Sequence, residues 1–152
     1  MRRSLILVLL VAGCATRPPQ SQALPGLFPA DALVTQRAVL TVHGRQFSLN
    51  GYLALSARGK RLIVMENFGA VLVDVLVKPD GTARVMRSSA SFRPEWIQRY
   101  MIPDMQCITG NEAGPVRKVS ATHFIIERSA YTLDLQTVQV APGPQSPELF
   151  GE

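Results

Sequence analysis

Few residues of this chain have the types and spacing that enzyme chemistry requires. The sequence contains neither the Gly-x-Ser-x-Gly turn that presents a nucleophilic serine nor a glycine-rich phosphate-binding loop. His43, His123 and Cys107 lack the spacing that is typical of metal ligands. We therefore expect no enzyme, no catalytic residue, no metal site and no cofactor.

Two further side chains could be reactive, and each has a structural alternative. Asp74 lies in the valine-rich segment 70–78, where its carboxylate is either a buried functional group or an outward-facing, arginine-paired residue. Cys107 lies between Met105 and Ile108, where its thiol either packs in the core or reacts. In both cases the surrounding residues favour the structural role.

Cys14 carries the clearest chemical signal. Two arginines follow the initiating methionine, an apolar run spans residues 5–11, and Ala12 and Gly13 precede the cysteine. The apolar run is too short for a membrane span, which needs about 20 residues. A charged start, a short apolar run and small residues before a cut are typical of a secretory signal peptide, here residues 1–13. The alternative is that Cys14 ends a buried helix.

The sequence from Leu10 to Cys14 resembles the lipobox of bacterial lipoproteins. The resemblance implies that the Cys14 thiol takes a diacylglycerol, that the chain is cut before Cys14, and that the new amino group is acylated. Two or three acyl chains hold a protein stably on a membrane, whereas one chain is marginal. Because Ala15, and not aspartate, follows the cysteine, the resemblance implies the outer membrane, with the protein facing the periplasm.

Charge and cysteine content restrict the partners. The formal charge is +5, and it falls by two if Arg2 and Arg3 leave with the signal peptide. The basic residues stand singly or in pairs, whereas a nucleic-acid partner needs a clustered patch, so we expect none. A mild attraction to anionic lipid headgroups and an ordinary solvated surface both fit this charge. If Cys14 is acylated, too few cysteines remain for a disulfide within the chain.

The rest of the chain divides into a tether, one domain and a tail. Prolines among polar residues in residues 14–30 indicate a tether. About ten such residues reach roughly 30 Å, enough to lift a domain off the headgroups. We expect Leu27 and Phe28 to dock the end of the tether on a single domain over residues 31–141. Further prolines predict a flexible tail over residues 142–152.

Period-two alternation of apolar residues predicts an antiparallel sheet over most of the domain. Tight turns separate a first group of expected strands, and further strands follow a helical region. In the last strand the apolar residues switch from odd-numbered to even-numbered positions, which predicts a bulge near Gln136–Thr137. The expected strands are residues 34–42, 46–56, 61–66, 70–78, 82–87, 116–120, 123–128 and 131–140.

One helix interrupts these strands. Apolar residues recur at helical spacing from Trp96 onward, and Pro103 would clash with the carbonyl of Arg99, so we expect a break near Ile102. We expect the helical stripe to pack across the apolar face of the longest strand, and the two faces form a candidate apolar groove. Its expected residues are Phe47, Leu49, Leu53, Leu55, Trp96, Ile97, Tyr100 and Met101.

The order of these elements resembles the LolA/LolB class of envelope proteins, and more closely small outer-membrane lipoproteins encoded beside aryl-polyene and fatty-acid-type synthesis genes. The segments Gly44–Ser48 and Ser91–Trp96 carry much of the resemblance. It implies an α+β fold in which a curved, incomplete antiparallel barrel encloses a cavity for acyl chains, lidded by helices. The implied function is binding or transfer of a lipid or lipoprotein acyl chain at the periplasmic face of the outer membrane.

The alternative function is a structural lipoprotein that docks a partner envelope assembly and binds no ligand. A large apolar groove would favour lipid binding, and a filled core with an exposed apolar patch would favour docking. Phe68 bears on both, because the turn signal Asn67–Gly69 places it either at a hairpin tip or at the end of a buried strand. In LolB-like carriers an apolar residue on a protruding loop is implicated in delivery to the membrane, and Phe68 is its nearest counterpart here.

Overall fold

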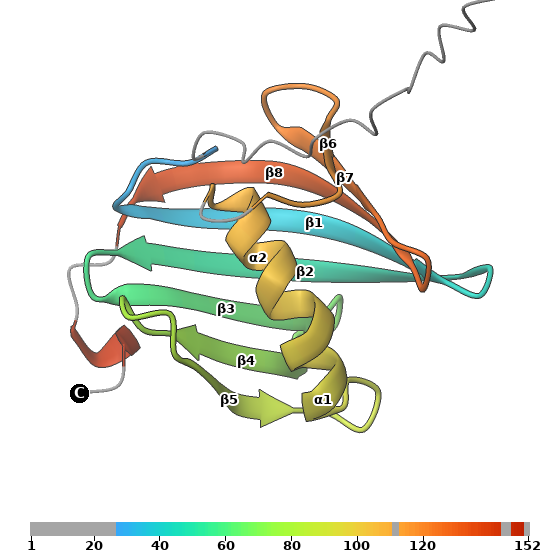
Figure 1. Ribbon diagram of the computed structural model, residues 1–152, viewed down its shortest axis with the longest axis horizontal. Coiled ribbons are helices and arrows are strands. Elements are labelled where there is room, and N and C mark those ends of the chain that lie inside the picture. Colours follow the sequence, from blue (N-terminus) through green and yellow to red (C-terminus); the bar gives the residue numbers. More distant parts are fainter. Residues whose placement is uncertain (1–26, 111–112, 144–146, 151–152) are drawn as a thin grey trace, which may run out of the picture.

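The computed structural model describes residues 27–110, 113–143 and 147–150 (Figure 1). The expected signal peptide, the lipid-attachment residue Cys14 and residues 14–26 of the expected tether lie outside the described residues. Leu27 and Phe28 pack on the core as expected, and the Phe28 ring meets the ring of Phe124 edge-on, 6.3 Å apart between centroids. Within the described residues, no helix has the length and apolar character needed to cross a membrane.

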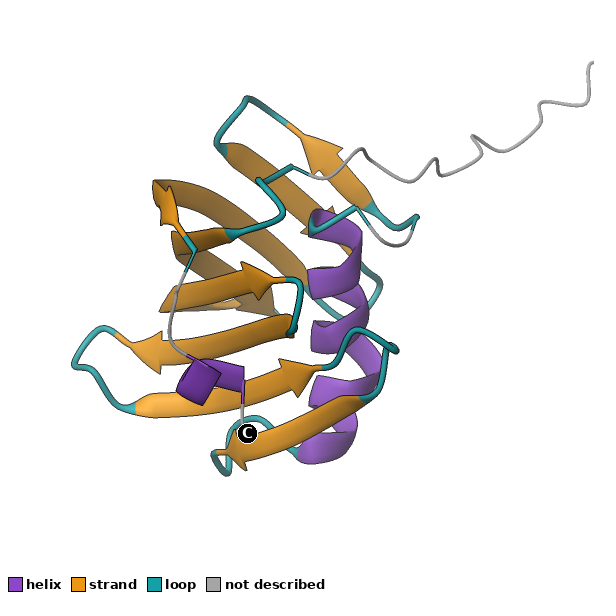
Figure 2. Cartoon of the chain, turned by 90° about the vertical axis from the view of Figure 1, so that its left-hand side faces the viewer, coloured by secondary structure: helices purple, strands orange, loops and turns teal. Residues whose placement is uncertain are grey.

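An antiparallel sheet forms the body of the described chain, and Figure 2 shows its strands stacked along one side of the helix. The strand order is β5-β4-β3-β2-β1-β8-β7-β6, so the described sheet remains open at β5 and β6. The strands in the described residues are β1 (Ala32–Val42), β2 (Arg45–Ser56), β3 (Gly59–Glu66), β4 (Val71–Val77), β5 (Ala83–Ser88), β6 (Val116–Lys118), β7 (His123–Glu127) and β8 (Thr132–Pro142). The expected α+β class, an unclosed antiparallel sheet with a helix packed across it, is confirmed.

The expected strand positions agree closely with the observed ones. Alternation predicts them well because most of these strands have one face toward the helix and one face toward water. On β4 the outer-face residues Leu72 and Leu76 are buried as well. The register between β1 and β8 shifts between Thr35 and Gln36, which leaves Val138 as the extra residue on β8. The expected bulge is therefore confirmed, displaced slightly from Gln136–Thr137.

The helix is continuous, and the expectation of a break near Ile102 is wrong. Its parts are α1 (Pro94–Trp96), the π-helical segment η1 (Ile97–Met101) and α2 (Ile102–Ile108). The amide of Ile102 donates to the carbonyl of Ile97, so just before the proline the backbone hydrogen bond reaches back five residues instead of the usual four. Pro103 lies directly after this widened turn, so its ring is not held to the spacing of a regular α-helix, in which it would clash with the carbonyl four residues before it. A wide turn, and not a gap, accommodates the proline ring.

The helix and the inner face of the sheet, which is the face toward the helix, share one core. Cys107 on α2 is buried, so the packing role expected for its thiol is confirmed. A Cβ on Gly114 would lie 2.1 Å from the Cys107 Sγ, which shows how closely the chain passes this thiol. The principal members of the core are Leu49, Leu53, Leu55, Val73, Val75, Ile97, Ile102, Met105, Ile108, Phe124 and Ile126.

Asp74 lies on the outer face of the sheet, and its arginine-paired role is confirmed. Arg61 on the neighbouring strand β3 donates from Nε to Asp74 Oδ1 at 2.9 Å and from Nη2 to Oδ2 at 2.7 Å. Arg61 Nη1 also donates to the carbonyl of Leu149 at 2.9 Å. The Arg61 guanidinium therefore ties β3 to β4 and to the C-terminal segment, on the face of the sheet away from the helix.

That C-terminal segment differs from the flexible tail expected over residues 142–152. Residues Pro147–Phe150 form the 3-10 turn η2, and Phe150 is buried against Ala54 and Leu76 of the outer face. The apolar ring of Phe150 and the carbonyl of Leu149 give this turn two attachments, which prolines in the sequence do not reveal.

Candidate functional site

A mostly apolar cavity of about 70 Å³ lies between the helix and the inner face of the sheet. Strands β1, β2, β3, β7 and β8 form one wall, and the helix forms the other. The cavity lies where two elements far apart in the sequence approach each other, as ligand sites in such folds commonly do. Its apolar lining includes Ala38, Leu40, Leu49, Leu62, Val64, Trp96, Met101, Met105, Ile108, Ile126, Leu133 and Leu135.

The residues of the candidate groove fall into three groups. Leu49, Trp96 and Met101 line the cavity. Leu53, Leu55 and Ile97 are buried in the surrounding core. The remaining two, Phe47 and Tyr100, lie outside both groups and are described separately below.

Phe47 is 47% exposed, although it shares the inner face with Leu49. Strand β3 ends at Glu66, which pairs with Leu49, so β3 does not extend beside Phe47. The aromatic ring therefore stands at the open end of the sheet and not in a groove.

An aromatic cluster closes one end of the cavity. Trp96 lies 5.6 Å from Phe92, 5.6 Å from Tyr100 and 5.3 Å from Tyr131 between ring centroids. Tyr100 and Tyr131 meet edge-on at 5.6 Å. Tilted and edge-on contacts of this kind are favourable beyond the burial of the rings. Tyr100 thus supports the wall of the cavity from behind.

Two polar side chains in the cavity wall were missed by the sequence analysis, and the first is Gln36. It is 2% exposed and follows Val34 and precedes Ala38 on the inner face of β1. Among the described residues, its Nε2 has no hydrogen-bond partner. The available signal was a polar residue at an inward position of a period-two pattern.

The second missed side chain is Asp104, which is 4% exposed on α2. Arg128 donates to Asp104 Oδ1 from Nε at 2.8 Å and from Nη2 at 2.6 Å, and the Tyr131 hydroxyl donates to Oδ2. Burial raises the pKa of Asp104, although the bonds from Tyr131 and Arg128 oppose that rise. The sequence did offer a signal, because Asp104 lies seven residues after Ile97 and therefore on the same buried face of the helix.

This network and one further contact attach the second half of the helix to the sheet. Arg128 and Tyr131 flank the turn between β7 and β8, so the Asp104 carboxylate ties α2 to that turn. Lys60 Nζ on β3 donates to the Thr109 hydroxyl at the end of α2 at 2.7 Å. In the described residues, the aromatic cluster and the apolar core hold the first half of the helix.

Phe68 is 97% exposed at the hairpin between β3 and β4. The Gly69 amide donates to the Glu66 carbonyl at 2.9 Å, and Gly69 has a φ of 88°, which glycine adopts without strain. The alternative in which longer strands bury Phe68 is therefore wrong.

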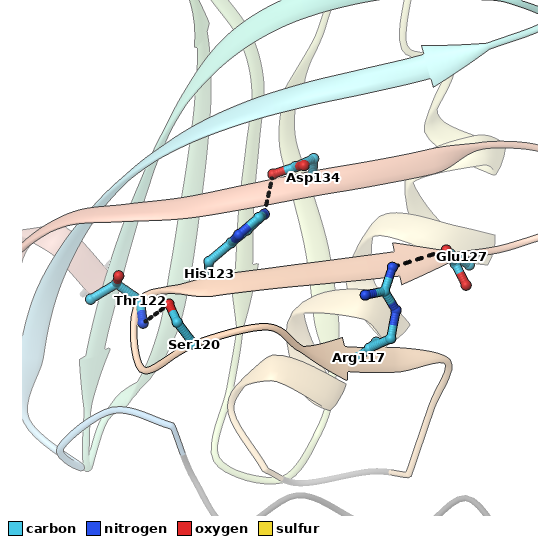
Figure 3. Close-up of polar contacts among 6 residues, drawn as sticks. All are labelled: Arg117, Ser120, Thr122, His123, Glu127 and Asp134. Carbon is cyan, nitrogen blue, oxygen red and sulfur yellow. Dashed lines mark hydrogen bonds and ion pairs between the residues drawn. The ribbon is translucent and has the colours of Figure 1, made fainter.

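The histidines lie away from the cavity. His43 occupies the turn between β1 and β2 with a φ of 48°. His123 Nε2 lies 2.8 Å from Asp134 Oδ1, and Arg117 pairs with Glu127 at 3.4 Å on the same group of strands (Figure 3). In the described part of the chain, no three His, Cys, Asp or Glu side chains gather in a way that could hold a metal ion.

Comparison of the whole sequence with known protein families and with curated proteins finds no match. The likeness to the LolA/LolB class therefore stays a prediction from the order of the elements in the sequence.

Proposed function

We propose that this protein is a lipoprotein, anchored through Cys14 to the outer membrane and facing the periplasm, that binds or transfers a lipid or lipoprotein acyl chain. The observation that carries the proposal is the mostly apolar cavity between helix and sheet. An apolar wall favours methylene groups over water, because each buried methylene contributes about 0.8 kcal/mol.

The size of the cavity limits what enters. About 70 Å³ is less than half of the roughly 150 Å³ that accommodates benzene in an engineered apolar cavity. The described space therefore takes a short part of one chain and not several chains. Met101 and Met105 in the wall are flexible side chains that adapt to an entering group.

The attachment of the helix indicates where more of a chain would enter. Polar contacts of Asp104 and Thr109 hold the second half of the helix to the sheet. The first half depends on apolar and aromatic packing, which can rearrange without leaving a buried charge unpaired. Outward movement of the α1–η1 half would lengthen the cavity beneath Trp96 and Met101.

Docking of a partner envelope assembly is a second candidate function, and two observations favour it. The space between helix and sheet is nearly filled, and Phe68 presents a fully exposed aromatic ring. An exposed ring at a hairpin tip gains nothing from the core, so contact with a membrane or a partner would give it a role.

Mass spectrometry of lipid that co-purifies from the native membrane tests the proposal. We expect the wild-type protein to retain a lipid at a fixed ratio, and Ala38→Leu, which fills the cavity, to lose it. Val39→Leu on the outer face is the matched control and should retain the lipid. Equal lipid content in Ala38→Leu and wild type would contradict binding in the cavity and leave docking as the better candidate.

A further inference from the structure

The cavity contains a polar group that a purely apolar ligand would not need. Gln36 is 2% exposed, and its Nε2 lacks a hydrogen-bond partner among the described residues. Leaving a buried amide N–H without a partner costs free energy, so such groups in folded proteins call for a specific explanation. A ligand atom that accepts a hydrogen bond would supply one.

Gln36 lies in the wall of the cavity, on β1 between the neighbouring strands β2 and β8. Gly51 lies directly opposite on β2, and a Cβ there would already be in contact with Gln36 Cβ at 3.7 Å. Thr137 lies opposite on β8, and its Oγ1 also lacks a partner among the described residues. Thr137 does not line the cavity, whereas Gln36 and Gly51 do. Gln36 is thus an amide in the cavity wall whose Nε2 is itself covered, and a turn of its terminal side-chain bond would bring this donor to a ligand.

Asp104 restricts the charge of that ligand. It lines the same cavity, and Arg128 and Tyr131 already donate to its two carboxylate oxygens. A ligand carboxylate would bring a second negative charge into a mostly apolar space that holds no further cation in its described lining. A neutral carbonyl oxygen accepts a hydrogen bond without that cost.

We propose that the cavity binds the ester end of a neutral acyl lipid, with the ester carbonyl oxygen accepting a hydrogen bond from Gln36 Nε2. The first methylene groups of the chain lie against the apolar wall. This inference rests on the proposed acyl-chain binding and specifies which part of the lipid enters. It also agrees with the small volume, because an ester and a few methylene groups need much less space than a whole chain.

Ligand titrations followed by NMR on the complete chain test this inference. The protein is held in nanodiscs of ether-linked phospholipid, which offers no ester carbonyl to compete. Ethyl acetate is the ester probe, and cyclopentane is the apolar probe. Both are close to benzene in size and exceed the described space, so their binding requires the outward movement of the α1–η1 half that the proposed function includes. Both are titrated into wild type, Gln36→Leu and Gln36→Met, which remove the amide at similar size, and into Thr137→Val and the exposed Gln46→Leu as controls.

We expect ethyl acetate to shift the side-chain amide signal of Gln36 in the wild type. Loss of one hydrogen bond should raise the dissociation constant of ethyl acetate about 3- to 10-fold in Gln36→Leu and Gln36→Met. Binding of cyclopentane should stay unchanged in both variants, and the two controls should bind both probes as the wild type does.

The possible failures are distinguishable. If Gln36→Leu changes the binding of ethyl acetate and cyclopentane equally, Gln36 makes no bond to the ester and this inference is overturned, while apolar binding stands. If Thr137→Val weakens ethyl acetate as much as Gln36→Leu does, both polar groups serve a shared network and the inference is again overturned. If the wild type binds neither probe, both this inference and the proposed acyl-chain binding are overturned.

Discussion

Asp104 is a carboxylate in a nearly dry environment, held between α2 and the turn that joins β7 to β8. Alanine at this position would leave the Arg128 guanidinium and the Tyr131 hydroxyl without their acceptor. Breaking a buried ion pair costs about 3–5 kcal/mol of unfolding free energy. Because Arg128 is partly exposed, we expect Asp104→Ala to lose about 3 kcal/mol. Urea denaturation measures this loss. Asp134→Ala removes a carboxylate that is 41% exposed and paired with His123, so it should lose only about 0–1 kcal/mol. Equal losses in the two variants would contradict the buried role of Asp104.

The same residue predicts a pH dependence of stability. Burial raises the pKa of Asp104 in the folded protein above its unfolded value of about 3.9. The folded state therefore binds this proton more tightly, and the resulting stabilisation is complete below that value and lost as the pH rises through the raised pKa. We expect the unfolding free energy of the wild type, relative to Asp104→Asn, to fall as the pH increases from about 4. Denaturation of both proteins across pH measures this, and a growing difference would contradict it.

Phe68 gives a prediction that separates surface contact from folding. Because its ring is 97% exposed, Phe68→Glu should change the free energy of unfolding by no more than about 0.5 kcal/mol. If the ring contacts a membrane or partner, the same variant should bind less to vesicles of outer-membrane lipid in a flotation assay. Phe68→Leu keeps an apolar tip and is the matched control. Unchanged vesicle binding by Phe68→Glu in this assay would contradict the proposed contact.

At the scale of elements, the π-helical segment explains how Pro103 fits inside a continuous helix. Deleting the exposed Gln98 would shorten η1 by one residue and favour a regular helix, in which the proline ring meets the carbonyl four residues before it. We expect this deletion to cost about 3 kcal/mol of unfolding free energy. Adding Pro103→Ala to the deletion should recover part of the loss in the same denaturation assay. A deletion variant as stable as the wild type would show that η1 does not serve the proline.

The strands were predictable from the sequence because alternation records which face of each strand meets the core. The bulge in β8 was predictable for the same reason, since one extra residue reverses the parity. Gln36 and Asp104 were not predicted, because the same pattern assigns polar residues to water and only the partner element shows otherwise. The π-helical segment was missed because helical spacing alone cannot separate a wide turn from a break. Burial of Phe150 depends on contacts with β2 and β4, far from it in the sequence.

For the whole molecule, the proposed anchor makes Cys14 the decisive residue. The modifying chemistry needs a thiol, so Cys14→Ala should abolish acylation and leave uncleaved precursor. Intact-mass analysis of protein from the membrane fraction measures both effects, and Cys107→Ala, which keeps the residue at position 14, is the control. An acyl-sized mass increase at residue 14 in the Cys14→Ala variant would disprove lipid attachment through that thiol.

The position of β1 has a consequence for how the chain assembles. β1 pairs with β2, which follows it directly, and also with β8, where Ala32 meets Pro142 at the far end of the domain. Hairpins from β1 to β5 can close locally as the chain emerges, whereas β8 must return across a long loop, which is slow. Until then β1 presents a long row of unsatisfied backbone groups, of the kind that recruits foreign strands. β8, the last strand of the described residues, completes the middle of the sheet, so β1 keeps an edge that can bind other strands until β8 has paired with it.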